Sequence, residues 1–172
     1  KKSQKVAIVT GASSGIGEST ALMFKKAGWI VYAGARRVDR MKKLEQEGIR
    51  VIELDVTVEE SMVNFVNTVI SESGRIDALV NNAGYGSYGA LEDVPLNEAR
   101  YQFEVNIFGL ARMTQLVLPG MREQREGKIV NISSIGGKFG EPHGSWYHAT
   151  KFAVEGLSDS LRMELKQFNI DV

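Results

Sequence analysis

The stretch Thr10-Gly11-Ala12-Ser13-Ser14-Gly15-Ile16-Gly17 decides the fold. It joins a short apolar run, typical of a buried strand, to a longer helical pattern. In such a turn Gly11 permits a tight bend, Gly15 lets the backbone approach a pyrophosphate, and Gly17 allows close packing of helix on strand. The start of the helix adds unpaired N–H groups and the positive end of a dipole. The stretch therefore predicts a phosphate-binding turn, and a purely structural glycine turn is the alternative.

Short apolar runs alternate with helical patterns along the rest of the chain. The runs predict strands at Val6–Thr10, Ile30–Ala33, Val51–Leu54, Ala78–Val80, Lys128–Ile132 and Ile170–Val172. The helical patterns cover Gly15–Ala27, Asp39–Glu47, Val58–Ile70, Pro95–Met121 and Trp146–Phe168. Because strand–helix–strand units cross over right-handed, this order predicts an α/β, Rossmann-like doubly wound parallel sheet with helices on both faces.

The composition fits a single domain over residues 1–172. Hydrophobic residues make up 43% of the 172 residues and charged residues 24%, which are values of a globular domain with a core. The 21 basic side chains balance 21 acidic ones, so we expect neither a nucleic-acid nor a membrane partner. The chain has no cysteine and two histidines, and no metal site is expected. Without a signal-peptide pattern or a membrane-spanning run, the expected location is cytoplasmic.

Four motifs together resemble the short-chain dehydrogenase/reductase family. They are Thr-Gly-x-x-x-Gly-Ile-Gly at residues 10–17, Asn81-Asn82-Ala83-Gly84, Asn106, and Ser134 with Tyr147-x-x-x-Lys151. Their order and separation match the family across the entire chain. The resemblance implies an oxidoreductase that uses a nicotinamide dinucleotide to interconvert a secondary alcohol and a ketone. The family's C-terminal strands and substrate lid are absent from this sequence, so we expect it to be the front part, or the ordered part, of a longer protein.

The pair Tyr147 and Lys151 has a chemical rationale of its own. Four residues apart on a helix, the two side chains share a face. A phenol has a pKa of about 10, and lowering it to about 7 takes roughly 4 kcal/mol. An ammonium group about 6 Å away contributes roughly 2.8 kcal/mol at an effective dielectric constant of about 20. The lysine therefore supplies much of the shift that would make the tyrosine a base at neutral pH.

The resemblance implies a role for each catalytic residue. Tyr147 would be the general acid/base, and Ser134 would hydrogen-bond the substrate oxygen. Lys151 would lower the tyrosine pKa and bind the nicotinamide ribose, and Asn106 would keep a water in line with Lys151. Ser133 is the alternative to Ser134, because adjacent strand residues face opposite sides, but Ser134 has the family's spacing from the tyrosine.

The expected cofactor contacts lie in the loops that follow the strands. They are Gly11, Ser13, Ser14, Gly15, Ile16, Gly17, Arg36, Arg37, Asp55, Val56, Asn82, Ala83 and Gly84, together with Tyr147 and Lys151. Asp55 and Val56 resemble the family pair that contacts adenine, and a simple turn aspartate is the alternative for Asp55. Asn81 either borders the cofactor or braces the central sheet.

The end of the second strand favours NADP(H), with NAD(H) as the alternative. An NAD enzyme usually has a carboxylate there for the ribose 2′-hydroxyl, whereas this chain has Arg36 and Arg37. A guanidinium can hold a 2′-phosphate with two hydrogen bonds. Arg36 is the first candidate and Arg37 the second. Asp39 lies close enough in sequence to read the ribose instead, and Ser14 stands where many NADP-preferring relatives have a basic residue.

The remaining expectations concern the substrate and the assembly. Aromatic and apolar loop residues favour an apolar or ring-shaped carbonyl compound, steroid-like or lipid-derived: Tyr85, Tyr88, Phe139, Pro142, His143 and Trp146. Small side chains on the final helix favour a homodimer or homotetramer, with packing on the chain's own sheet as the alternative: Ala149, Ala153, Gly156 and Ser160. A non-catalytic nucleotide sensor is the second functional hypothesis. A sugar epimerase fits less well, because extended relatives usually carry Thr-Gly-x-x-Gly-x-x-Gly.

Overall fold

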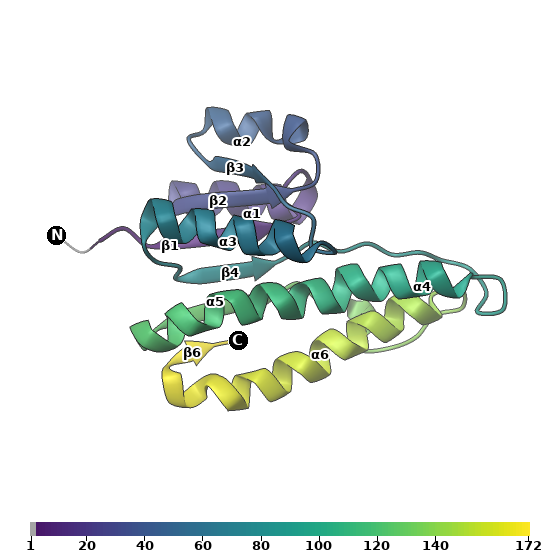
Figure 1. Ribbon diagram of the computed structural model, residues 1–172. Helices are drawn as coiled ribbons and strands as arrows, with labels where there is room; N and C mark the ends of the chain where they lie inside the picture. The colour runs from purple at the N-terminus through teal and green to yellow at the C-terminus, as the bar shows by residue number, and fades with distance from the viewer. Residues whose placement is uncertain (1–2) are drawn as a thin grey trace.

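A computed structural model of the protein describes residues 3–172 and contains one six-stranded parallel sheet (Figure 1). The strand order is β3-β2-β1-β4-β5-β6, and every neighbouring pair is parallel. The strands are β1 (Val6–Thr10), β2 (Ile30–Ala35), β3 (Arg50–Glu53), β4 (Ala78–Asn81), β5 (Gly127–Asn131) and β6 (Ile170–Asp171). The order reverses between β1 and β4, which confirms the doubly wound, Rossmann-like prediction.

Helices cover both faces of the sheet. They are α1 (Gly15–Lys26), α2 (Lys42–Gln46), α3 (Glu59–Ser73), α4 (Leu96–Phe103), α5 (Leu110–Gln124) and α6 (Ser145–Leu165). Short 3₁₀ turns precede α2 (η1, Val38–Met41), follow β5 (η3, Ile135–Gly137) and extend α6 (η4, Lys166–Phe168). No helix within residues 3–172 is both long and apolar enough to cross a bilayer.

The predicted single helix over Pro95–Met121 is wrong in one respect. A π-helical segment, η2 (Glu104–Gly109), separates α4 from α5, although the three run on as one long rod beside α6 (Figure 1). Gly109 comes so close to the loop after β3 that a Cβ there would lie 2.6 Å from the carbonyl oxygen of Val56. The side chain of Asn106 is bound to a neighbouring loop. The contacts of Gly109 and Asn106 are with segments far away in the sequence, so helical periodicity alone does not predict the π-helical segment.

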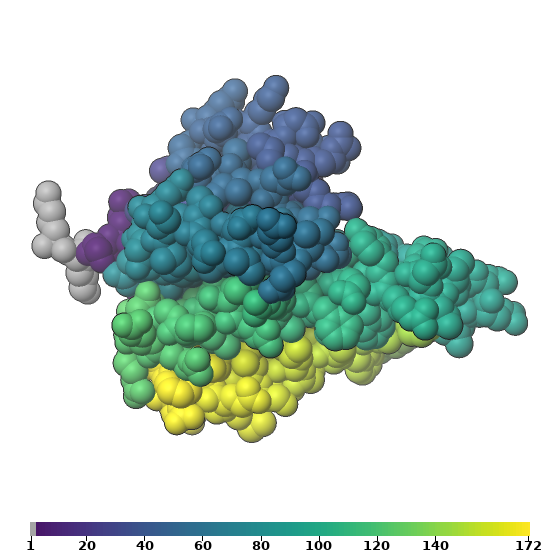
Figure 2. Space-filling view, viewed as in Figure 1, coloured from purple at the N-terminus to yellow at the C-terminus, as the bar shows by residue number. Residues whose placement is uncertain are grey.

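The strands have apolar side chains on both faces, and this divides the core into two layers. Val6 and Ile8 of β1 pack in a cluster with side chains of α3, α5 and α6, whereas Val9 packs with side chains of α1 and α2. Successive side chains of a strand point to opposite faces, so a run without polar residues requires a cover on each side. Figure 2 shows the resulting body, with the segment around α4 extending beyond it.

Hydrogen bonds join the two halves of the sheet where its order reverses. The buried hydroxyl of Thr10, at the end of β1, accepts hydrogen bonds from the backbone N–H groups of Asn82 and Ala83, each at 3.0 Å. The side-chain amide of Asn82 donates to the carbonyl of Gly11 at 3.0 Å. A Cβ on Gly17 would collide with that same carbonyl. The loops after β1 and β4 are thereby held at one edge of the sheet.

Replacing Thr10 with valine tests this junction. Valine keeps the volume of threonine but leaves two N–H groups without their acceptor, so we expect the free energy of unfolding to fall by about 1–3 kcal/mol. Urea denaturation measures the change, and Thr10→Ser, which keeps the hydroxyl, is the control. Equal denaturation midpoints for the valine variant and the parent would show that the junction does not stabilise the fold.

Candidate functional site

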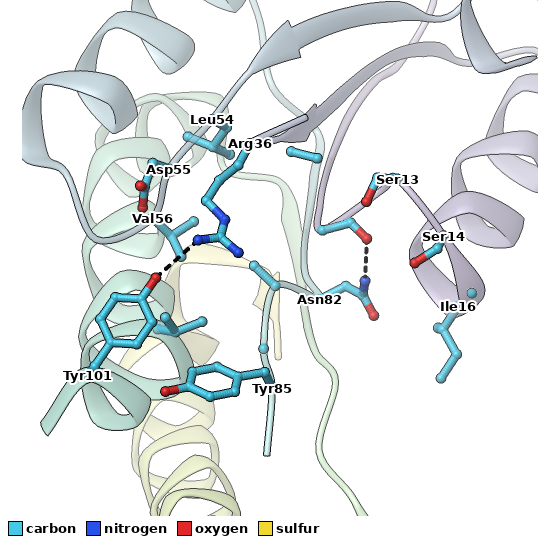
Figure 3. A pocket seen from close by; sticks show the side chains of 16 residues that line it. Ser13, Ser14, Ile16, Arg36, Leu54, Asp55, Val56, Asn82, Tyr85 and Tyr101 are labelled. Carbon is cyan, nitrogen blue, oxygen red and sulfur yellow. Dashed lines mark hydrogen bonds between the residues drawn. The ribbon is translucent and has the colours of Figure 1, made fainter. Parts of the chain in front are cut away.

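A pocket of about 640 Å³ lies at the carboxyl ends of β1, β2, β3 and β4 (Figure 3). It brings together most of the residues expected to bind the cofactor: Gly11, Ser13, Ser14, Gly15, Ile16, Arg36, Asp55, Val56, Asn82, Ala83 and Gly84. Ala35, Leu54, Tyr85, Tyr101 and Val105 also line it. Gly17, Arg37, Tyr147 and Lys151 are not among its lining residues. The sequence contains no local signal for Tyr101 or Val105, because their helix meets the pocket only through the tertiary fold.

The turn after β1 has the backbone geometry of an anion site. Gly11 and Gly15 have φ angles of 61° and 56°, which glycine adopts without the strain that other residues incur. Ser14 is the N-cap of α1, yet its side chain makes no capping hydrogen bond. The first N–H groups of α1 therefore lack a side-chain cap beside the pocket.

The structure separates the two arginine candidates. Arg36 extends from the end of β2 across the pocket, and its Nη1 donates to the hydroxyl of Tyr101 on α4 at 3.2 Å (Figure 3). Arg37 is exposed, and its Nε lies 4.0 Å from the carboxylate of Asp39. Neither Arg37 nor Asp39 lines the pocket. Arg36 is therefore the one of the two arginines that lines the pocket.

The structure shows the hydrogen-bond partners of Asp55 and Asn81, for each of which the sequence allowed two roles. Oδ1 of Asp55 accepts from the backbone N–H and the hydroxyl of Thr57, at 2.9 and 2.7 Å, so Asp55 shapes its turn while also lining the pocket. Asn81 is buried, and its amide donates to Oδ1 of Asn131 at 3.0 Å and to the hydroxyl of Thr114 at 3.1 Å. Asn81 therefore braces the central sheet.

Tyr147 and Lys151 lie one turn apart near the start of α6. The Lys151 ammonium is 5.8 Å from the centre of the Tyr147 ring, and it donates to the carbonyl of Ile132 at 3.0 Å. Lys151 is only 9% exposed, and burial lowers its pKa below the usual lysine value. A buried ammonium is costly to maintain, and this one is held beside a phenol.

The two candidate serines face different neighbours. Oγ of Ser134 accepts from the N–H of Gly136 at 3.0 Å, and a Cβ on Gly136 would lie 3.2 Å from Cε1 of Tyr147. Oγ of Ser133 is buried, makes no hydrogen bond within residues 3–172, and would lie 3.0 Å from a Cβ on Gly137. Ser134 is thus linked through one glycine to the tyrosine, whereas the Ser133 hydroxyl is enclosed.

Asn106 ties the loop after β4 to α6. Its Oδ1 accepts from the N–H of Tyr85 at 3.0 Å, and its Nδ2 donates to the carbonyl of Tyr85 at 2.9 Å. The same Nδ2 donates at 3.0 Å to the hydroxyl of Thr150, which donates at 2.7 Å to the carbonyl of Tyr147. No hydrogen bond in the described part of the chain joins Asn106 directly to Lys151. Asn106 lies in the π-helical segment, a feature that often marks functional sites.

Aromatic side chains surround the Tyr147 ring. The Tyr88 ring lies 5.6 Å from it, and a Cβ on Gly86 would lie 3.0 Å from both rings. Burial raises the pKa of Tyr85 and of Tyr88 above the ordinary phenol value, so neither is a base at neutral pH.

Comparisons with known proteins agree with this geometry. Residues 5–172 match the model of the short chain dehydrogenase family. The 3-ketodihydrosphingosine reductase of Bacteroides thetaiotaomicron is 46% identical over 169 residues, which are 98% of this chain and 61% of that relative. This chain therefore spans about three fifths of that curated relative.

Solved structures show the same likeness. A short-chain dehydrogenase from Streptomyces avermitilis has a TM-score of 0.97 and 42% identity, over 100% of this chain and 64% of that one. A metagenomic short-chain oxidoreductase in complex with NADP has a TM-score of 0.92 and 33% identity, over 98% and 79% of the two chains. An NAD⁺-bound xylitol dehydrogenase has a TM-score of 0.91 and 31% identity, over 100% and 69%. Because the family model matches residues 5–172 and the relatives reach 46% identity, the chain belongs to the short chain dehydrogenase family.

Proposed function

We propose that the protein is an NADP(H)-dependent oxidoreductase that interconverts a secondary alcohol and a ketone, with Tyr147 as the general acid/base. The observation that carries this proposal is that the Lys151 ammonium lies 5.8 Å from the centre of the Tyr147 ring, while Gly136, which is hydrogen-bonded to Ser134, lies next to the same ring. Tyr85 lines that pocket, and its neighbour Gly86 packs against the Tyr147 ring. A substrate bound at Tyr147 would therefore lie next to the dinucleotide pocket.

The pocket residues fit a nicotinamide dinucleotide. The α1 terminus without a side-chain cap and the two left-handed glycines suit a pyrophosphate, and Asp55 and Val56 suit an adenine. When bound, the nicotinamide supplies or accepts the hydride at the carbon that bears the substrate oxygen.

In the reducing direction, Tyr147 donates its phenolic proton to the substrate oxygen, and the Lys151 ammonium stabilises the phenolate that remains. Oγ of Ser134 already accepts from the Gly136 N–H, so its own proton is available for a hydrogen bond to the same oxygen. Asn106 holds the Tyr85 peptide and, through Thr150, the backbone at Tyr147. The water that Asn106 would align with Lys151 stays a prediction.

Arg36 supports NADP(H) as the preferred cofactor. It is an arginine that lines the pocket, and no acidic side chain except Asp55 lines it in the described residues. Structural neighbours hold NADP in one case and NAD⁺ in another, so the family alone does not decide the preference.

The proposed substrate is an apolar, lipid-derived carbonyl compound. The Tyr88 ring lies beside the Tyr147 ring, and Tyr85 lines the adjacent pocket. The Bacteroides relative is named 3-ketodihydrosphingosine reductase. The homodimer or homotetramer and the cytoplasmic location stay predictions.

Replacing Tyr147 with phenylalanine tests the mechanism. Loss of the phenolic proton should lower kcat by about 100- to 10,000-fold, while the Kd for NADPH stays within twofold. NADPH oxidation is followed by absorbance with 3-ketodihydrosphingosine, a 17-ketosteroid and cyclohexanone as substrates. Undiminished turnover by the variant would refute the mechanism, whereas NADPH binding by the parent without turnover of any ketone would favour the sensor.

A second pair of variants tests the cofactor preference. Arg36→Ala should raise the KM for NADPH by about 10- to 100-fold, as expected for the loss of hydrogen bonds to a charged phosphate. The KM for NADH should change less than twofold. Arg37→Ala is the matched control, because it removes the same charge next to the pocket. Equal effects of Arg36→Ala on both cofactors would contradict the proposal.

Replacing Lys151 with methionine should raise the thermal stability and abolish the activity. Lys151→Met removes a buried ammonium but keeps most of the packing, so Tm should rise by a few degrees while turnover is lost. The pKa of Lys151 is lower in the folded than in the unfolded chain, so the ammonium lowers the free energy of unfolding by its full amount at any pH below the folded pKa. This destabilisation disappears as the pH rises to the usual lysine pKa, where the folded protein holds the neutral amine. Thermal melts at pH 7 and pH 10 measure the difference in Tm between Lys151→Met and the parent, which should be smaller at pH 10. A lower Tm for the variant than for the parent at pH 7 would show that Lys151 stabilises the fold.

A further inference from the structure

His148 is a buried side chain that the proposed mechanism does not use. It follows Tyr147 on α6 and is 6% exposed. Its ring lies between two glycine backbones. A Cβ on Gly144 would lie 2.7 Å from Cδ2 of the imidazole, and a Cβ on Gly136 would lie 3.2 Å from Nδ1. The ring is therefore held closely between two segments of the loop that connects β5 to α6.

Two hydrogen bonds connect His148 to Gly136 and to Gly144 of this loop. Nδ1 lies 3.0 Å from the carbonyl oxygen of Gly136, and the backbone N–H donates to the carbonyl of Gly144 at 2.8 Å. A carbonyl oxygen only accepts, so Nδ1 carries the proton. On the other side of the ring, Nε2 lies 3.7 Å from the carboxylate of Glu141. His148 thereby fixes Gly136 relative to the first turn of α6.

The fixed Gly136 peptide contacts both proposed catalytic side chains. Its N–H donates to Oγ of Ser134 at 3.0 Å, and its Cα faces the edge of the Tyr147 ring. A path therefore leads from the imidazole through the carbonyl, Cα and N–H of Gly136 to the serine hydroxyl. The Gly136-Gly137 pair has high intrinsic backbone freedom, so this peptide needs an external restraint if the serine is to keep one position.

We propose that His148 is a positioning residue, whose Nδ1–H holds the carbonyl of Gly136 and, through the backbone of that residue, sets the distance between the Ser134 hydroxyl and the Tyr147 phenol. This inference rests on the proposed function. A displacement of about 1 Å can lower a rate by about 100-fold, so restraint of the serine is expected to affect kcat. The dinucleotide pocket does not include His148, and cofactor binding should be unaffected.

Two substitutions separate the hydrogen bond from the bulk of the ring. Asparagine bears its amide nitrogen on Cγ, as histidine bears Nδ1, so His148→Asn can still donate to Gly136. Leucine fills the slot without a donor. We expect His148→Leu to lower kcat at least tenfold with the KM and Kd for NADPH within twofold, and His148→Asn to stay within threefold of the parent kcat. Both are measured in the whole protein, with the ketone that the parent reduces fastest.

His148→Leu in the Ser134→Ala background tests whether His148 acts through Ser134. If His148 acts through Ser134, His148→Leu should lower the remaining kcat less than twofold there, because the two effects are not additive. If the leucine variant does not fold, as judged by its thermal melt, His148→Gln replaces it. Its amide lies one bond too far out for Gly136, so the same loss is expected.

Several results would overturn the inference: a parent-like kcat for His148→Leu, an equally slow His148→Asn, or a full additional loss in the Ser134→Ala background. Tyr147→Phe, measured alongside, separates the two claims. If Tyr147→Phe is inactive and His148→Leu is normal, only the role of His148 is wrong. If Tyr147→Phe is fully active, or no ketone is reduced by the parent, the proposed function fails and the role of His148 fails with it.

Discussion

The hydroxyl of Thr10 connects the end of β1 to the loop after β4, and the pocket is built around this connection. β1 and β4 are neighbours in the sheet, and the next strands in the chain lie on opposite sides of this pair. By accepting from the N–H groups of Asn82 and Ala83, Thr10 keeps the glycine turn and the loop after β4 at one edge of the sheet. The absence of a Cβ at Gly17 lets α1 start against the same turn. The pocket at this edge follows from these contacts, because its walls are the loops that they hold.

A second set of contacts attaches the proposed catalytic group to that edge. Asn106 binds the Tyr85 peptide and, through Thr150, the backbone of Tyr147. The π-helical turn presents this asparagine between the loop after β4 and α6. Asn106 therefore connects α6 to Tyr85, which lines the pocket, although the three segments lie far apart in the sequence. The side-chain amide of Asn106 and the hydroxyl of Thr150 have partners for all of their donors, which restricts how these two side chains can be arranged.

Function and stability oppose each other in this region. Lys151 is buried with one carbonyl as its hydrogen-bond partner, and the first turn of α1 has no side-chain cap. Each arrangement costs free energy in the folded state. A bound dinucleotide would offset these costs, because its phosphates would occupy the helix terminus and its ribose would approach the lysine. The ligand is therefore expected to stabilise the protein by mass action.

Patterns within single elements were enough to predict the sheet, the glycine turn and the shared face of Tyr147 and Lys151, because period and spacing fix neighbours inside a strand or helix. Contacts between distant segments decided the rest: the hydrogen bond from Arg36 to Tyr101 across the pocket, the separate surroundings of Ser133 and Ser134, the bracing role of Asn81, and the π-helical turn at Asn106. The direction of a side chain at the end of a strand depends on what packs against it. That packing is a property of the folded chain, so the tertiary structure alone could decide it.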